Sequence, residues 1–216
     1  MANMGLLVTM TEPPPQMEEE FNAWYDTEHI AERLAITGFR SARRWVRDCK
    51  PGKGKYLATY ELDTPGVLDT AEYKSHIGDH FTPWSRRCLG KAVVSRRWAT
   101  EQINPGNGGP DPQARALLMV AANVDDAHED AFNRWYDEEH LPLLAKVPGV
   151  LRARRFHAGT GSPRYLALYE MTDAAAVMQH AGFKAALDTE LSRRMLATAG
   201  DWEMHTFQAY DADAPA

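Results

Sequence analysis

The chain has 216 residues, of which 44% are hydrophobic and 25% are charged, a composition typical of a soluble globular protein with one or two domains. Its net charge of −6 and its 24 scattered basic residues argue against nucleic acid or an anionic membrane as a partner. The sequence shows no signal-peptide pattern, no membrane-spanning apolar run and no disulfide or zinc spacing of its two cysteines, so we expect a cytoplasmic protein.

Each half of the chain shows the same order of predicted elements. The first half predicts a strand at 6–10, a helix at 17–36, strands at 39–47 and 55–62, a helical region at 65–89 and a strand at 92–100. The corresponding segments of the second half are 117–121, 126–146, 150–157, 164–171, 174–197 and 202–210. Gly38 and Gly149 are expected to end the first helix of each half. The order β-α-β-β-α-β predicts a ferredoxin-like domain in each half.

A nine-residue segment occurs twice in the chain. Residues 21–29 (FNAWYDTEH) and 132–140 (FNRWYDEEH) agree at seven of nine positions, at an offset of 140 − 29 = 111. Residues 56–61 match 165–170 at an offset of 165 − 56 = 109, which indicates a duplicated domain. The Pro- and Gly-rich stretch between the copies predicts a linker. We therefore place one domain at 1–103, a linker at 104–113 and a second domain at 114–216.

The predicted strand 56–62 carries apolar residues on both faces, so each sheet should need a second sheet as a partner. We predict an α+β chain whose two antiparallel sheets face each other as an intrachain α/β barrel. The element order, the duplication and the segments WYDTEHI and WYDEEHLP, each followed by Gly and then Ala-Arg-Arg, resemble the dimeric α/β-barrel superfamily, and its EthD-like branch in particular. The resemblance covers essentially the whole chain. Relatives include lactone isomerases, polyketide cyclases, cofactor-free monooxygenases, aldoxime dehydratases and haem peroxidases, so the fold alone does not choose a reaction.

The repeated segment should place a carboxylate among aromatic residues. At about 100° per residue, Glu28 shares the sheet-facing side of its helix with Trp24, and His29 lies at the edge of that side. A buried carboxylate must be paired, protonated or placed at a cavity. Pairing with an arginine of the next strand, in either half, would give Glu28 and its copy Glu139 a purely structural role. The tryptophans are expected in the core, and the aspartates of the segment are expected in solvent.

The two histidines of the repeat are candidate acid/base groups, because each follows a tyrosine by one helical turn and a glutamate by one residue. We favour the second copy, since Pro142 after His140 should kink the helix, whereas the first copy has Ala31. The predicted catalytic residues are His140, Glu139, Tyr136, His29, Glu28 and Tyr25. The predicted substrate-binding residues are Arg154, Arg155, Tyr169, His157, His205, Trp135 and Tyr60.

These groups predict an enzyme of the lyase or isomerase type that needs no organic cofactor. It would isomerise, dehydrate or cyclise a small aromatic or apolar oxygenated metabolite, with His140 as acid or base and Glu139 as its electrostatic partner. One alternative is a cofactor-free monooxygenase, and another is a binding or accessory protein without chemistry. The sequence shows no glycine-rich cofactor turn and no convincing metal-ligand set. The expected partner is a small-molecule substrate, and the fused barrel could also form a homodimer.

Overall fold

A computed structural model of the chain describes residues 2–159 and 161–211, which form two compact units. The first unit runs to Glu101 and takes in the end of the last strand from Ala209, and the second unit is Gln102–Gln208. Residues 104–113, predicted to be a linker, are held by the second unit. The Gly108 carbonyl accepts a hydrogen bond of 3.3 Å from Arg154, and the Asp111 amide donates one of 2.5 Å to Glu170.

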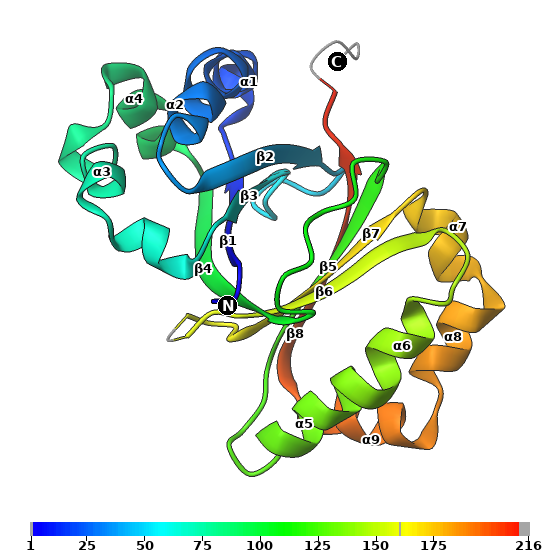
Figure 1. The fold of residues 1–216 in the computed structure, drawn as a ribbon. Helices are drawn as coiled ribbons and strands as arrows, with labels where there is room; N and C mark the ends of the chain where they lie inside the picture. The colour runs from blue at the N-terminus through cyan, green and yellow to red at the C-terminus, as the bar shows by residue number, and fades with distance from the viewer. Residues whose placement is uncertain (1, 160, 212–216) are drawn as a thin grey trace. The chain divides into compact units, whose positions relative to one another are not determined.

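The first unit follows the predicted order of elements. They are β1 (Gly5–Glu12), α1 (Glu18–Trp24), α2 (Ile30–Leu34), β2 (Phe39–Val46), β3 (Tyr56–Leu62), α3 (Ala71–Lys74), α4 (Pro83–Lys91) and β4 (Val94–Asn104). Short 3-10 turns occupy Pro15–Met17, Pro65–Asp69 and Gly78–His80. The strands pair antiparallel in the order β2-β3-β1-β4, and the helices lie on one face of this sheet (Figure 1).

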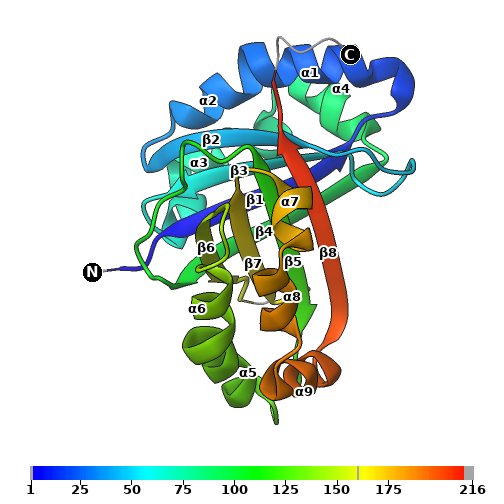
Figure 2. The same cartoon turned by 90° about the vertical axis from the view of Figure 1, so that its right-hand side faces the viewer.

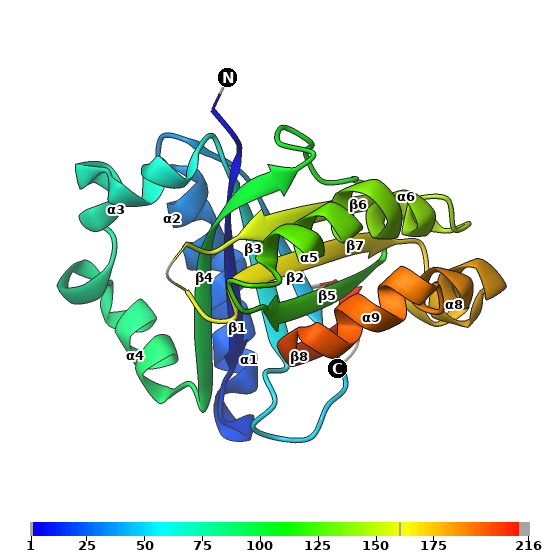
Figure 3. The same cartoon turned by 90° about the horizontal axis from the view of Figure 1, so that it is seen from below.

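The second unit repeats this arrangement. Its elements are β5 (Ala116–Asn123), α5 (Glu129–Trp135), α6 (Leu141–Leu144), β6 (Val150–His157), β7 (Tyr165–Met171), α7 (Ala174–Gln179), α8 (Ala181–Leu187), α9 (Glu190–Thr198) and β8 (Gly200–Ala209). The strand order is β6-β7-β5-β8, again antiparallel, with the helices beside the sheet (Figure 3). Each unit is therefore ferredoxin-like, as the sequence predicts.

The core of each unit lies between its helices and its sheet. Phe21 and Trp24 join Tyr60 of β3 in one buried cluster, and Phe132 and Trp135 take the same place in the second unit. The expectation that these tryptophans are core residues is confirmed. In the part of the chain that the structure describes, no helix is both long and apolar enough to cross a membrane.

The first helix of each unit is interrupted by a π-helical turn, Tyr25–His29 in one copy and Tyr136–His140 in the other. Figure 2 shows α1 and α2, which flank the first of these turns, following one another along the sheet. In each turn the next amide bonds to the carbonyl five residues earlier, which inserts one extra residue and rotates the remainder of the helix. Both histidines are consequently buried, at 8% and 4% exposure, rather than lying at the helix edge. The turn forms with and without the following proline, so Pro142 is not its cause.

Candidate active site

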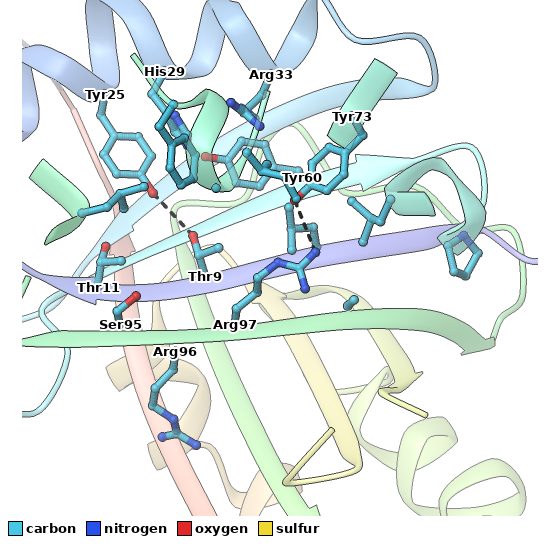
Figure 4. A pocket seen from close by; sticks show the side chains of 18 of the residues that line it. Thr9, Thr11, Tyr25, His29, Arg33, Tyr60, Tyr73, Ser95, Arg96 and Arg97 are labelled. Carbon is cyan, nitrogen blue, oxygen red and sulfur yellow. Dashed lines mark hydrogen bonds between the residues drawn. The ribbon is translucent and has the colours of Figure 1, made fainter. Parts of the chain in front are cut away.

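A cavity of about 740 Å³ lies between the helices and the sheet of the first unit (Figure 4). Its volume is in the range of sites for small molecules. Tyr25, His29 and Arg33 line it from the interrupted helix, each four residues after the last. Tyr60 of β3 and Tyr73 of α3 complete its aromatic wall. The cavity thus adjoins the first copy of the repeated segment, whereas the sequence interpretation favoured the second.

His29 is the imidazole of this cavity. Its ring lies 4.3 Å from the Trp24 ring and 5.1 Å from the Tyr25 ring, measured between centroids. Burial, followed by the positive charges of Arg33 and Arg44, lowers the pKa of His29 to about 3. The imidazole is therefore neutral near physiological pH.

Two tyrosine hydroxyls can serve the same cavity. Burial raises the pKa of Tyr60 well above its ordinary value, so its hydroxyl stays protonated and can donate a hydrogen bond. The neighbouring Tyr25 hydroxyl adds to this shift, and the Tyr60 ring lies 6.3 Å from that of His29. The Tyr25 hydroxyl lies 3.4 Å from the hydroxyl of Thr9 on β1.

Two arginines that the sequence interpretation missed also line the cavity. Arg33 is only 2% exposed, and its Nη2 donates to the His76 carbonyl at 2.7 Å and to the Glu32 carboxylate at 2.9 Å. Arg97 of β4 lies at the exposed rim and donates from Nη2 to the Tyr73 hydroxyl at 3.3 Å. Figure 4 shows both guanidinium groups near the tyrosines of the cavity.

Several polar side chains of the cavity have no polar counterpart in the second copy. Six lining positions are polar there and apolar at the matching positions of the second copy. The pairs are Thr9 with Val120, Thr11 with Ala122, Arg33 with Leu144, Tyr73 with Phe183, Ser95 with Trp202 and Arg97 with Met204. These departures from the repeat are a signal that a comparison of the two halves could have found from the sequence.

In the second unit, apolar groups pack around the matching space. Phe183 and Ala186 of α8 are buried in its core, and Trp202 packs against the same cluster. Tyr73 and Thr82 of the first unit are 82 − 73 = 9 residues apart, whereas the matching Phe183 and Thr189 are 189 − 183 = 6 residues apart. The first unit therefore has three more residues in this segment. Helix α3 accordingly stops at Lys74, and a looser segment with Gly78 at a φ of 63° takes the place of the rest of α8.

His140 has a packed environment in this second unit. Trp135, Tyr136 and Tyr169 surround its ring at 4.4, 5.1 and 6.5 Å. Burial lowers the pKa of His140 to about 4, although a hydrogen bond with the Ala186 backbone opposes the shift. This backbone contact and the surrounding rings hold the His140 imidazole in place.

The glutamates of the repeat contact neither the predicted arginines nor the histidines. Glu28 accepts hydrogen bonds from Thr82 at 2.6 Å and Ser85 at 3.4 Å. Glu139 accepts the matching bonds from Thr189 at 2.6 Å and Ser192 at 3.4 Å. The extra residue of the π turn rotates the helix, so these carboxylates face the second helical region. Glu139 is therefore bonded to Thr189 and Ser192 and does not pair with His140 as predicted.

The aspartates of the repeat form the arginine pairs instead. Arg44 donates to Asp26 at 2.7 Å, and Arg155 lies 3.4 Å from Asp137. The expectation that these carboxylates are free in solvent is therefore wrong. The Arg44 guanidinium also lies 3.8 Å from the centre of the Tyr210 ring. Each arginine is buried among aromatic rings, where it packs over the tyrosine of its repeat and pairs with the aspartate.

The remaining residues predicted to bind substrate do not gather around His140. Arg154 forms a buried ion pair with Glu170 at 2.7 Å. His157 accepts a hydrogen bond of 3.3 Å from Gly159 at the end of its strand. His205 pairs with Glu203 at 3.1 Å and lies opposite Met119 of β5. The neighbouring Leu118 faces the helices, so His205 lies on the other face of the sheet. Among the described residues, no group of three His, Cys, Asp or Glu side chains could hold a metal ion.

Two fused ferredoxin-like units of this kind define the dimeric α/β-barrel fold. No family model and no curated protein sequence matches the chain. Solved structures do: an anthrone oxidase-like protein has a TM-score of 0.65 at 16% identity, covering 98% of this chain and 92% of its own. A chlorite dismutase variant from Candidatus Nitrospira defluvii has a TM-score of 0.58 at 9% identity, covering 98% and 93%. A Listeria monocytogenes ferredoxin-fold protein related to antibiotic biosynthesis monooxygenases has a TM-score of 0.53 at 9% identity, covering 97% and 96%.

These similarities confirm the predicted α+β fold class and the dimeric α/β-barrel fold. At such identities they concern the fold alone. Assignment to the EthD-like branch stays a prediction.

Proposed function

We propose that the first unit is the catalytic domain of a cofactor-independent enzyme of the lyase or isomerase type. Its substrate is a small, largely aromatic oxygenated molecule, and its reaction is an isomerisation, dehydration or cyclisation. The observation that carries the proposal is that neutral His29 and the protonated Tyr60 hydroxyl line one aromatic cavity of about 740 Å³. A proton acceptor beside a hydrogen-bond donor is the minimum set for moving a proton next to a carbonyl group.

In this mechanism His29 removes a proton from a carbon next to a carbonyl group of the substrate. The electron pair of the broken C–H bond moves onto the oxygen, and the Tyr60 hydroxyl donates a hydrogen bond to the resulting anion. The new negative charge opposes the effect of Arg33 and Arg44 on the imidazole, so the proton transfer becomes less unfavourable as the anion forms. Return of the proton to another carbon gives isomerisation, and loss of hydroxide with that proton gives dehydration.

A cofactor-free monooxygenase is the second candidate. It would form the same anion and let it react with molecular oxygen. The favouring observation is that structures of this fold include an anthrone oxidase-like protein and a relative of antibiotic biosynthesis monooxygenases. If the repeated segment had only a structural role, both copies would be tightly packed, and the cavity beside His29 does not fit that expectation.

Deuterium incorporation from heavy water, followed by NMR over a panel of aryl ketones, phenols and unsaturated lactones, tests the proposal. We expect exchange or turnover with the wild type, a loss of at least about 100-fold in His29→Gln, and little change in His140→Gln. The second variant is a matched control, because both histidines occupy the same π turn. Equal rates for the wild type and His29→Gln would contradict the proposal, and oxygen uptake with substrate would favour the monooxygenase.

A further inference from the structure

We propose that the cavity of the first unit binds its substrate as an anion, a small aromatic carboxylate whose charged group is held by Arg33 and Arg97. The inference rests on the proposed function and names the substrate class of the same site. His29 and Tyr60 would then face the part of the molecule that reacts. Tyr73, which lies beside both arginines, would complete the carboxylate-binding end.

The fold does not require the buried cation at position 33. The matching residue of the second unit is Leu144, which is fully buried in that unit's apolar core. Burying a guanidinium group lowers the stability of the fold unless hydrogen-bond or charge partners compensate for the lost hydration. The partners of Arg33 are Glu32, whose side chain is 20% exposed, and one backbone carbonyl. Both bind Nη2, and Nε has no partner among the described residues, so the group keeps donors for a ligand.

The second cation lies where a ligand would enter the cavity. Arg97 is exposed at the rim, yet its guanidinium group is turned toward the Tyr73 hydroxyl rather than into solvent (Figure 4). The matching residue is Met204, which is 60% exposed, so this position also has no structural need for charge. Two arginines that converge on one tyrosine can offer a carboxylate several fixed donors.

The charge balance of the lining supports an anionic ligand. Of its ionised side chains, Arg96 points away from the cavity and packs over the Trp98 ring (Figure 4). Arg33, Arg97 and Asp69 remain, and their charges sum to 2 − 1 = +1 with His29 neutral. The single carboxylate, Asp69, is exposed and lies 4.0 Å from the Lys74 ammonium group. Between the two ends, apolar and aromatic side chains provide walls for a ring. These are Leu68, Tyr60, Ile77, Phe81 and Leu89.

Calorimetric titration with 2-naphthoate and its neutral counterpart 2-naphthamide tests this inference. The two probes share a ring system and differ in charge. We expect the wild type to bind the carboxylate at least about tenfold more tightly than the amide, with a preference that falls as salt is added. Arg33→Leu copies the second unit, so it should fold, and we expect it to abolish the preference while leaving amide affinity within about threefold.

Arg97→Met should weaken the preference less, by about three- to fivefold, because its guanidinium group is more exposed to solvent. Arg40→Leu, which removes an exposed arginine outside the cavity, is the control and should bind like the wild type. Equal affinity for the two probes, binding of neither probe, or an unchanged preference in Arg33→Leu would each overturn the inference. A charge preference without any His29-dependent exchange would instead support it and contradict the proposed catalytic function.

Discussion

The Glu28 carboxylate accepts a hydrogen bond of 2.6 Å from the hydroxyl of Thr82, the residue that caps the amino terminus of α4. Ser85, one turn into that helix, donates to the same carboxylate and accepts a bond of 3.1 Å from the Trp24 indole. Glu139 and Thr189 form the same contact in the second unit. The glutamate of the repeat therefore joins two helices, and the repeat encodes scaffold at this position.

Replacing Ser85 with alanine should reduce stability without affecting catalysis. The variant leaves the buried Trp24 indole without an acceptor, so we expect a loss of about 1–3 kcal/mol in the free energy of unfolding. Urea denaturation measures the loss, and Ser192→Ala should show a similar one because its contact to Trp135 is the same. A fall in turnover with unchanged stability would show that this network serves the reaction.

The two buried histidines should make the protein sensitive to acid. An unfolded histidine has a pKa near 6.5, whereas the pKa is about 3 for His29 and about 4 for His140 in the folded chain. Between these values the unfolded chain binds more protons, so unfolding becomes easier as pH falls below about 6.5. Each histidine should contribute up to about 1.4 kcal/mol per pH unit within its window, and nothing further above pH 6.5.

Urea denaturation at several pH values checks this dependence. His29→Gln should show a shallower slope than the wild type between about pH 3.5 and 6, because one of the protonation sites has been removed. His80→Gln, which alters an exposed histidine, is the control and should keep the wild-type slope. Identical slopes for the wild type and His29→Gln would mean that His29 is not buried in its neutral form.

Filling the mouth of the cavity should block the site while keeping the fold. Ser95→Trp introduces the residue that the second unit has at the matching position, where Trp202 packs against the helices. We expect ligand affinity to fall at least about tenfold, since the indole would occupy the ligand's volume, while stability changes by less than about 1 kcal/mol. Ser95→Ala removes the hydroxyl without adding volume and should bind ligand normally. Unchanged affinity in Ser95→Trp would place the ligand elsewhere.

The adjacent arginines of β6 should differ in their contribution to stability. Arg154→Met leaves the Glu170 carboxylate, 2% exposed, without its counter-ion, and should cost about 3–5 kcal/mol. Arg155→Met leaves Asp137, which is 46% exposed and can be solvated, so it should cost less, about 1–3 kcal/mol. Chemical denaturation gives both values, and the reverse order would contradict the structural roles assigned to the two pairs.

The linear chain is enough to reveal the duplication, the order of elements and the core role of Trp24 and Trp135. These features follow from repeats and from apolar periodicity, which are properties of neighbouring residues. The prediction that Gly38 and Gly149 end the first helices is wrong, because these helices end at Leu34 and Leu144. Each glycine instead lies directly before the next strand, with a φ near +90° that an L side chain rarely adopts.

Which copy holds the cavity was decided by the tertiary structure. The rotation that buries His29 comes from a π turn, and a wheel drawn at 100° per residue assumes that no such turn exists. The roles of Glu28 and Arg44 depended on partners 54 and 18 residues away, so local spacing could not assign them. Arg33 is visible in the sequence as a departure from Leu144. It lines a cavity only because helix α3 ends early and leaves the space beside His29 unfilled.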